Sequence, residues 1–119
     1  MVLELADMSL VQSGAHIGGK VCESVTGSCV DVIDPANTEV IGSVPEMNGD
    51  DTRQAILAAD VALDAWKTTT AASRSERLQA WHTHVIESKE DIARLITAES
   101  GKPIAESRGE VEYLSLIHI

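Results

Sequence analysis

Hydrophobic and polar positions follow two different patterns on either side of residue 48. Before it, short runs of β-favouring residues alternate with turn residues rich in Gly, Asp and Pro. Pro35 and Pro45 close two of these runs, because proline cannot donate to a strand ladder. The pattern predicts a small antiparallel β-meander, with strands at residues 20–24, 29–33 and 40–44.

A helical period begins after residue 48. Ile56, Ala59, Leu63 and Trp66 follow one another at spacings of three and four, which predicts an amphipathic helix over residues 52–67. Asp50 or Asp51 can cap it, since a carboxylate accepts hydrogen bonds from the free N–H groups of the first turn. The chain then continues through a short Thr-rich loop at residues 68–70.

Two or three further helices are predicted beyond that loop. Ser73 and Glu76 have the spacing of a capping box, so a second helix is expected to begin near Ser73. A third start signal lies at residues 88–91, and Gly101 is placed to end that helix in the left-handed conformation. Pro103 can open a fourth helix, where a missing N–H costs nothing.

Composition limits the classes of function. The 119 residues suit one domain or a piece of a larger protein, and 44% apolar with 24% charged residues can build a core. The net charge of −10 argues against nucleic acid and anionic membrane as partners. With no apolar run near 18 residues and no Arg-rich leader, we expect a soluble protein, cytoplasmic, or mitochondrial if the true N-terminus differs.

Few residues suggest chemistry directly. Cys22 and Cys29 lack CxxC spacing, so we interpret them as free thiols, with a short-range disulfide as the alternative. His82 and His84 would point about 200° apart on a helix and cannot share a metal ion. The paired acids fit helix caps and solvated surface, and neither GxGxxG nor GxxxxGK[ST] occurs.

The two tryptophans also have a structural interpretation. Trp66 and Trp81 each fall on an apolar stripe, so we expect both to pack in a core rather than stack on a ligand. The motifs alone therefore indicate no active site.

Taken in order, the segments resemble the N-terminal part of the aldehyde dehydrogenase superfamily, most closely the succinate-semialdehyde dehydrogenases. The most specific piece is Thr-Ala-Glu-Ser-Gly-Lys-Pro at residues 97–103. Two positions depart from the family pattern: Val21 stands where a Trp is usual, and Thr38 where a turn glycine is common. The other matching pieces are residues 17–20, 32–37, 41–45, 52–56, 65–66, 72–77, 81 and 91–96, with Glu106, Gly109, Glu110 and Tyr113.

The resemblance implies an α/β parent in which this piece is a short β-meander followed by three to four helices. In such enzymes a cysteine thiolate attacks an aldehyde, hydride passes to NAD or NADP, and a glutamate activates the water that releases the acid. These groups and the dinucleotide site lie downstream of the matching region, so we expect the piece itself to be inactive and to bind no cofactor. Cys22, Cys29 and Lys102 match N-terminal motifs instead and are given no catalytic role.

The resemblance also implies partners and one further site. The parent is expected to act on a small aldehyde, with succinate semialdehyde foremost, and to form a homodimer or homotetramer. Some relatives hold a structural monovalent cation, which would map to the backbone oxygens of Val32 and Ile33 and the carboxylate of Glu99. The alternative for Glu99 is a solvated acid at a helix end.

The resemblance predicts three parts: an N-terminal extension at residues 1–15, an incomplete cofactor-domain segment at 16–113, and a non-native tail at 114–119. The tail can be encoded by CTG TCT CTT ATA CAC ATC, a string similar to a transposase adapter used in sequencing libraries. We expect it to fray or project without burying Leu116 and Ile117. The competing hypothesis for the whole chain is a free-standing acidic module that binds a protein partner through apolar helix faces.

Overall fold

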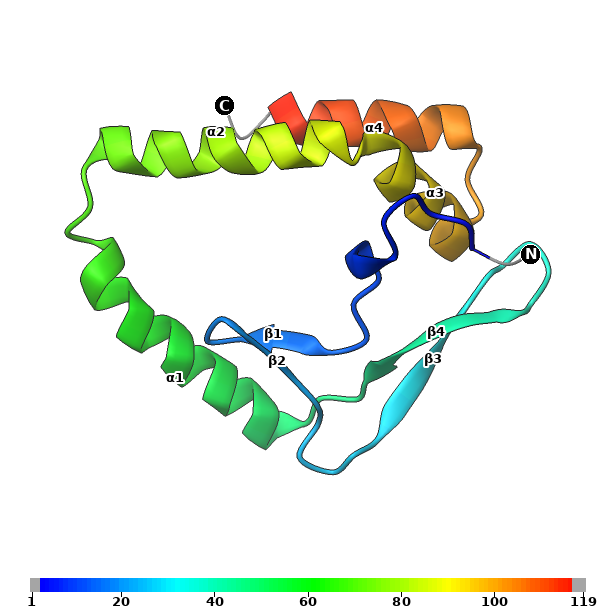
Figure 1. Cartoon of the computed structure of the whole chain (residues 1–119). Coiled ribbons are helices and arrows are strands. Elements are labelled where there is room, and N and C mark those ends of the chain that lie inside the picture. The colour runs from blue at the N-terminus through cyan, green and yellow to red at the C-terminus, as the bar shows by residue number, and fades with distance from the viewer. Residues whose placement is uncertain (1–2, 117–119) are drawn as a thin grey trace. The chain divides into compact units, whose positions relative to one another are not determined.

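The computed structural model describes residues 3–116 and contains short paired strands followed by four helices (Figure 1). A single 3₁₀ turn, η1 (Met8–Leu10), precedes them, and the Asp7 side chain caps it by accepting from the Ser9 N–H. The fold class predicted from the sequence is confirmed. Within that class, the strands form two separate hairpins, β1–β2 and β3–β4, rather than one continuous meander.

The first hairpin joins β1 (Ala15–Ile17) to β2 (Lys20–Cys22) in antiparallel register, with His16 opposite Val21. Gly18 and Gly19 form its two-residue turn at φ values of 59° and 77°. Tight hairpin turns of this kind require positive φ at both positions, which glycine adopts without a Cβ clash. The sequence analysis predicted β2 but not β1, whose Ala15 is of a type depleted in strands.

The second hairpin joins β3 (Cys29–Ile33) to β4 (Val40–Pro45). Its connection is organised by Asp34, whose buried carboxylate accepts from the Ala36 N–H at 2.8 Å and whose backbone carbonyl accepts from the Thr38 N–H at 2.8 Å. Thr38 has φ 63°, a value that β-branched residues rarely adopt. This is the position where the proteins that the sequence resembles commonly have a turn glycine.

Helix α1 (Gly49–Trp66) begins at Asn48 rather than at Asp50 or Asp51, which corrects the predicted cap. The Asn48 side chain accepts from the N–H groups of Asp50 and Asp51, and the Asp51 carboxylate accepts from the Asn48 N–H in return. This reciprocal arrangement is a capping box with Asn in the first position. The 52–67 prediction therefore located the helix but placed its start three residues late.

Helix α2 (Ala71–Glu87) begins at Thr70, whose hydroxyl accepts from the Ser73 N–H at 3.2 Å. The predicted capping box at Ser73 and Glu76 is therefore wrong, because a Ser already inside the first turn no longer caps it. Helix α3 (Lys89–Ser100) follows after Ser88, which makes no side-chain cap. Gly101 ends α3 at φ 73°, as predicted.

Helix α4 (Ile104–Leu116) starts directly after Pro103, whose carbonyl accepts from the N–H groups of Glu106 and Ser107. The helix continues through Leu116, so residues 114–116 do not fray. The expectation about burial of Leu116 and Ile117 lies outside the residues whose side chains the structure describes.

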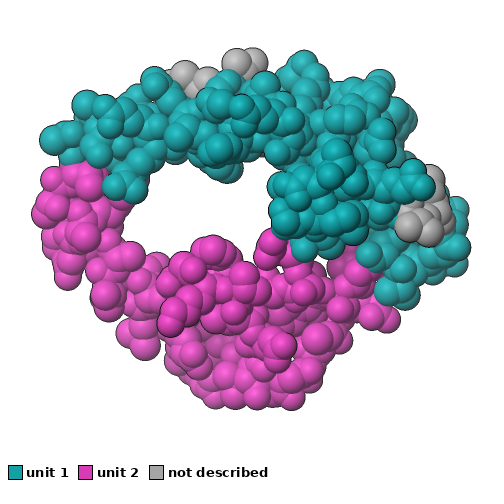
Figure 2. Space-filling view, viewed as in Figure 1, with its two compact units in different colours: residues 1–11, 33–41, 70–119 teal, residues 12–32, 42–69 magenta. Residues whose placement is uncertain are grey.

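The chain divides into two compact units, coloured separately in Figure 2. One comprises residues 1–11, 33–41 and 70–119 and contains α2, α3 and α4; the other comprises residues 12–32 and 42–69 and contains β1, β2 and α1. In the first unit, α3 and α4 enclose the buried side chains of Ala93, Ala98 and Val111. Ser107 is fully buried there and shares a 2.8 Å hydrogen bond with Thr97.

The apolar faces of α1 and α2 stay open to solvent. Trp66 and Trp81 are 41% and 51% exposed, so the prediction that both pack in a core is wrong for this chain. Their stripes exist as predicted, but both indoles keep a large part of their surface exposed. No helix among residues 3–116 is both long enough and apolar enough to cross a membrane.

Candidate functional site

The residues that the sequence singled out for possible chemistry do not converge. Cys22 at the end of β2 is half-buried and Cys29 at the start of β3 is exposed, and both are free thiols. Lys102 forms an ion pair with Glu110 on α4. Within residues 3–116, no three His, Cys, Asp or Glu side chains are grouped so that they could hold a metal ion.

The candidate cation ligands lie on two elements. Val32 and Ile33 belong to β3, and Glu99 stands in the last turn of α3 with an exposed side chain. Exposure of Glu99 suits a solvated acid at a helix end. The cation site stays a prediction.

The strongest charged cluster joins α3 to α4. Glu90 receives two hydrogen bonds from Arg108, Nε to Oε2 and Nη2 to Oε1, both 2.8 Å long, and Arg94 lies 3.5 Å from Oε1. Chiefly because Arg108 donates to it, the pKa of Glu90 falls from 4.5 to about 2. The same contact raises the pKa of Arg108. A carboxylate held ionised between two guanidinium groups is a poor general base, so this cluster is structural.

Two buried aspartates also have structural partners. Asp51 accepts from the Ser24 hydroxyl and from the N–H groups of Val25 and Asn48; the Asn48 bond, the largest of these effects, lowers the pKa of Asp51 although burial opposes it. Asp91 accepts from the consecutive N–H groups of Ala6 and Asp7 at 3.0 and 2.9 Å. Each aspartate anchors a loop to the start of a helix.

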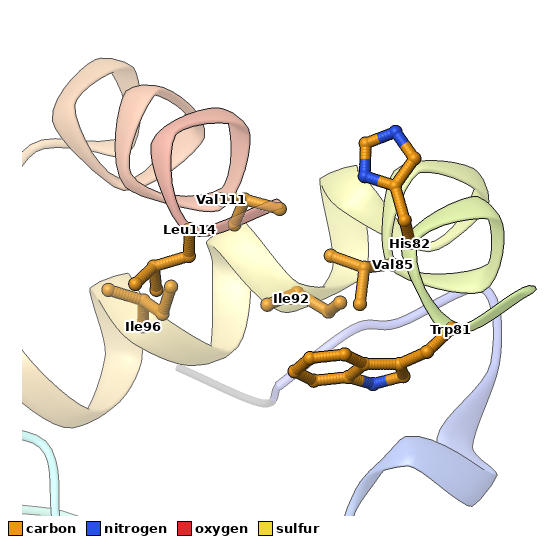
Figure 3. Close-up of a pocket in the computed structure, with 7 residues that line it drawn as sticks. All are labelled: Trp81, His82, Val85, Ile92, Ile96, Val111 and Leu114. Carbon is orange, nitrogen blue, oxygen red and sulfur yellow. The ribbon is translucent and has the colours of Figure 1, made fainter. Parts of the chain in front are cut away.

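An apolar pocket of about 370 Å³ lies in the first unit where α2, α3 and α4 meet. Figure 3 shows the Trp81 indole beside Ile92 and Val85, with the His82 ring directed away from that group. The sequence analysis placed these residues on helix faces but did not identify the pocket, because the facing helices are adjacent only in the fold. Its lining residues are Trp81, His82, Val85, Ile92, Ile96, Val111 and Leu114.

The described residues do not fit a dinucleotide cofactor. Such a site requires a crevice at the carboxyl ends of parallel strands, with a glycine-rich turn leading into a helix. The part of the chain that the structure describes has two hairpins, and its sequence has no glycine-rich fingerprint. No step of hydride transfer can therefore be assigned to these residues.

Comparison with known proteins gives a consistent family. A sequence model of the aldehyde dehydrogenase family matches residues 22–118. The glutarate-semialdehyde dehydrogenase of Pseudomonas putida is 45% identical over 111 residues, covering 93% of this chain and 23% of that protein. The NADP⁺-dependent succinate-semialdehyde dehydrogenase of Escherichia coli is 43% identical over 111 residues, which cover 93% of this chain and 23% of that protein.

Solved structures agree with this match in three dimensions. An NADP-dependent enzyme of E. coli superposes with a TM-score of 0.95 at 42% identity, covering 97% of this chain and 24% of that one. The succinate-semialdehyde dehydrogenase of Burkholderia pseudomallei superposes with a TM-score of 0.91 at 38% identity, and the match covers 93% of this chain and 23% of that one. The chain spans about a quarter of the length of the relatives it matches, and its region corresponds to their N-terminal part. With a family match over most of its length and its fold retained in these structures, this chain belongs to the aldehyde dehydrogenase family.

Proposed function

We propose that the whole protein is an NAD(P)-dependent dehydrogenase that oxidises an aldehyde to its carboxylic acid, and that this chain is its N-terminal scaffold segment. The observation that carries the proposal is the family match over residues 22–118. One relative is named as an NADP⁺-dependent enzyme and one solved neighbour is a complex with NAD⁺, so the cofactor is proposed as either one.

The proposed substrate is an aldehyde that carries a second, anionic group, with succinate semialdehyde foremost. Relatives between 39% and 45% identical are named for glutarate semialdehyde, succinate semialdehyde, 3-sulfolactaldehyde and aspartate semialdehyde. All four aldehydes bear a carboxylate or sulfonate. By contrast, a solved neighbour that is only 31% identical is named for betaine aldehyde, which is cationic.

The segment by itself is proposed to be inactive and to bind no cofactor. Lys102 pairs with Glu110, and the buried carboxylates of Asp51 and Asp91 accept hydrogen bonds from backbone N–H groups. The two free thiols do not converge with other candidate residues. In the whole protein we further propose a homodimer or homotetramer in the cytoplasm.

The test is to recover the coding sequence beyond this region and assay the complete product. With succinate or glutarate semialdehyde, NADH or NADPH formation at 340 nm is expected, and betaine aldehyde should be a much poorer substrate. The 119-residue chain, purified away from host dehydrogenases, is the matched control and should give the rate of a no-protein blank. A complete product that oxidises none of these aldehydes would count against the proposal, and a confirmed stop after Ile119 would favour the free-standing module.

The division into residues 1–15, 16–113 and 114–119 is kept as a proposal, with the last segment non-native. The family match extends to residue 118 and so includes most of that segment. Amplifying the source transcript without transposase adapters tests it directly. Recovery of the same six codons would overturn the non-native assignment.

A further inference from the structure

The sequence contains two asparagines, Asn37 and Asn48, with different residues after them. An asparagine loses its amide nitrogen when the backbone nitrogen of the next residue attacks its side-chain carbonyl carbon. Gly49 follows Asn48 and leaves that nitrogen unshielded, because glycine has no Cβ. Thr38 follows Asn37 and crowds the nitrogen with a branched Cβ. The surroundings of the two side chains differ in the same direction.

Asn48 presents its side-chain carbonyl to the first turn of α1. Its Oδ1 accepts from the N–H groups of Asp50 at 2.8 Å and Asp51 at 3.1 Å. The same two donors stabilise negative charge that develops on this oxygen when the carbon is attacked. In the part of the chain that the structure describes, no hydrogen bond uses the Gly49 N–H. Beyond neighbouring backbone, a Cβ built on Gly49 would meet only Nη1 of Arg53, at 3.9 Å, so the attacking group is uncrowded.

Asn37 is held in the opposite way. Its Oδ1 accepts from the Glu39 N–H and its Nδ2 donates to Oε2 of Glu39, each over 2.9 Å. The nitrogen that would attack it belongs to Thr38, whose N–H already donates to the Asp34 carbonyl at 2.8 Å. The Asn37 side chain is nevertheless exposed, so water reaches it. Hydrogen bonding, rather than access of water, therefore distinguishes the two asparagines.

We propose that Asn48 is a site of spontaneous deamidation and that the isomer formed decides whether α1 keeps its cap. The Gly49 nitrogen forms a bond to Cγ of Asn48 and gives up its proton, and Nδ2 leaves as ammonia. Water then opens the resulting succinimide at one of its two carbonyls, which gives aspartate or isoaspartate at this position. Ring closure turns Asn48 away from its capping conformation at ψ −172°, and such a change costs least at a helix end, where local opening is easiest.

The two products differ in what they do to the start of α1. An aspartate at position 48 can accept the same two N–H bonds, and its charge is favoured at a helix N-terminus. Isoaspartate adds a methylene to the backbone, which displaces the N–H that the Asp51 carboxylate accepts from residue 48. Asp51 also accepts from the Ser24 hydroxyl and the Val25 N–H. Loss of the cap therefore loosens both the first turn of α1 and the loop that Asp51 holds.

The test follows both asparagines in the 119-residue chain during incubation in mildly alkaline buffer. Samples are digested at acidic pH, where the reaction is slow, and each conversion is measured by peptide mass spectrometry. Asn48 should convert at least about tenfold faster than Asn37, because only its attacking nitrogen and carbonyl are arranged for the reaction. Gly49→Ala, which the space around Gly49 accommodates, should slow the conversion of Asn48 by about tenfold.

The same incubation in urea gives the ratio of the two rates that the sequence alone produces. Folding should slow Asn37 more than Asn48, so the ratio should be larger in the folded chain. A ratio no larger than that in urea would show that the cap blocks the reaction and would overturn the proposal, as would an Asn48 that converts no faster than Asn37.

Hydrogen exchange of the separated products tests the effect on the cap. Asn48→Asp provides the aspartate form directly, and its exchange at Asp51 and Val25 should match that of the original chain. The isoaspartate form should exchange about 2- to 30-fold faster at these amides, the factor expected for the loss of a helix cap. Equal exchange in the two isomers would contradict the second half of the proposal.

Discussion

Arg108 on α4 reaches across to Glu90 on α3 and donates to both of its carboxylate oxygens, each over 2.8 Å. Eighteen residues separate the two in sequence, so this pair fixes one helix against the next. A fork-shaped guanidinium facing a planar carboxylate gives the best geometry available to an ion pair. Both side chains are about half exposed, at 48% for Glu90 and 44% for Arg108, so solvent screens the attraction.

The first prediction concerns the pH dependence of this pair. Because the pKa of Glu90 is lowered in the folded state from 4.5 to about 2, the ionised pair stabilises the fold above pH 4.5. That stabilisation is lost as the pH falls from 4.5 towards 2. A ¹³C NMR titration of the Glu90 carboxyl should give a midpoint well below 4.

Glu90→Gln is the control for this prediction, since many acids titrate in the same range. The difference in unfolding midpoint between the original chain and Glu90→Gln should shrink between pH 5 and pH 2.5. A Glu90 carboxyl that titrates near 4.5, or a constant difference between the two proteins, would show that the pair is not maintained in solution.

Thr38 is predicted to be a point of backbone strain. Its φ of 63° is unfavourable for a β-branched residue by roughly 1–2 kcal/mol. Glycine avoids this cost, but the greater conformational freedom of its unfolded chain offsets about 0.5–1 kcal/mol of the gain. Thr38→Gly should therefore stabilise the chain by about 0.5–1 kcal/mol. Urea unfolding followed by far-UV circular dichroism, at one fixed protein concentration, measures the change.

Thr38→Asn and Thr38→Val make the matched comparison at that position. Asparagine tolerates positive φ and should fall between threonine and glycine, whereas valine keeps the branched Cβ and should give no gain. A lower unfolding midpoint for Thr38→Gly than for the original chain would contradict the strain interpretation.

Gly101 is predicted to tolerate no side chain. It ends α3 at φ 73°, and a Cβ built on it would lie 2.9 Å from Cγ of Pro35. Gly101→Ala should cost about 1–2 kcal/mol for the left-handed conformation alone, with the Pro35 contact adding to it. Gly109 supplies the contrast, because a Cβ there meets nothing within 4 Å in α4. Gly109→Ala should stabilise the chain by roughly 0.5–1 kcal/mol, and a loss at Gly109 as large as at Gly101 would contradict the argument.

Much of the fold could be predicted because local chemistry determines it. Gly101 ends α3 because glycine adopts the left-handed conformation whatever residues surround it. The change from β-favouring to helical periodicity likewise falls where α1 begins. The caps were harder to predict, since neighbouring Ser, Thr, Asn and Asp compete for the role. Asn48 caps α1 where Asp50 or Asp51 was expected, and Thr70 caps α2 where Ser73 was expected.

Burial and the pocket could not be predicted from the sequence, because they depend on which elements meet. The stripe containing Trp81 suggested a core position, yet its side chain is 51% exposed. Periodicity identifies the apolar face of a helix but not the surface that covers it. The pocket has the same origin, since Ile96 and Val111 line it together only after α3 and α4 pack.

The last prediction is that the 119-residue chain associates with itself in solution. On α1, Ile56 is 63% exposed, Val61 75% and Leu63 51%, and Leu78 on α2 is 39% exposed. Burying a large apolar side chain contributes about 1.5–3 kcal/mol to stability. A few such side chains left exposed therefore lose a free energy comparable with the roughly 5–15 kcal/mol by which a whole domain is stable. Sedimentation velocity should therefore show oligomers that grow with protein concentration. Ile56→Lys with Leu63→Lys, which places charge on the open face of α1 without disturbing a buried group, should shift the distribution towards monomer. A sharp monomer boundary with a cooperative melt in the unmodified chain would show that the segment is stable without further cover.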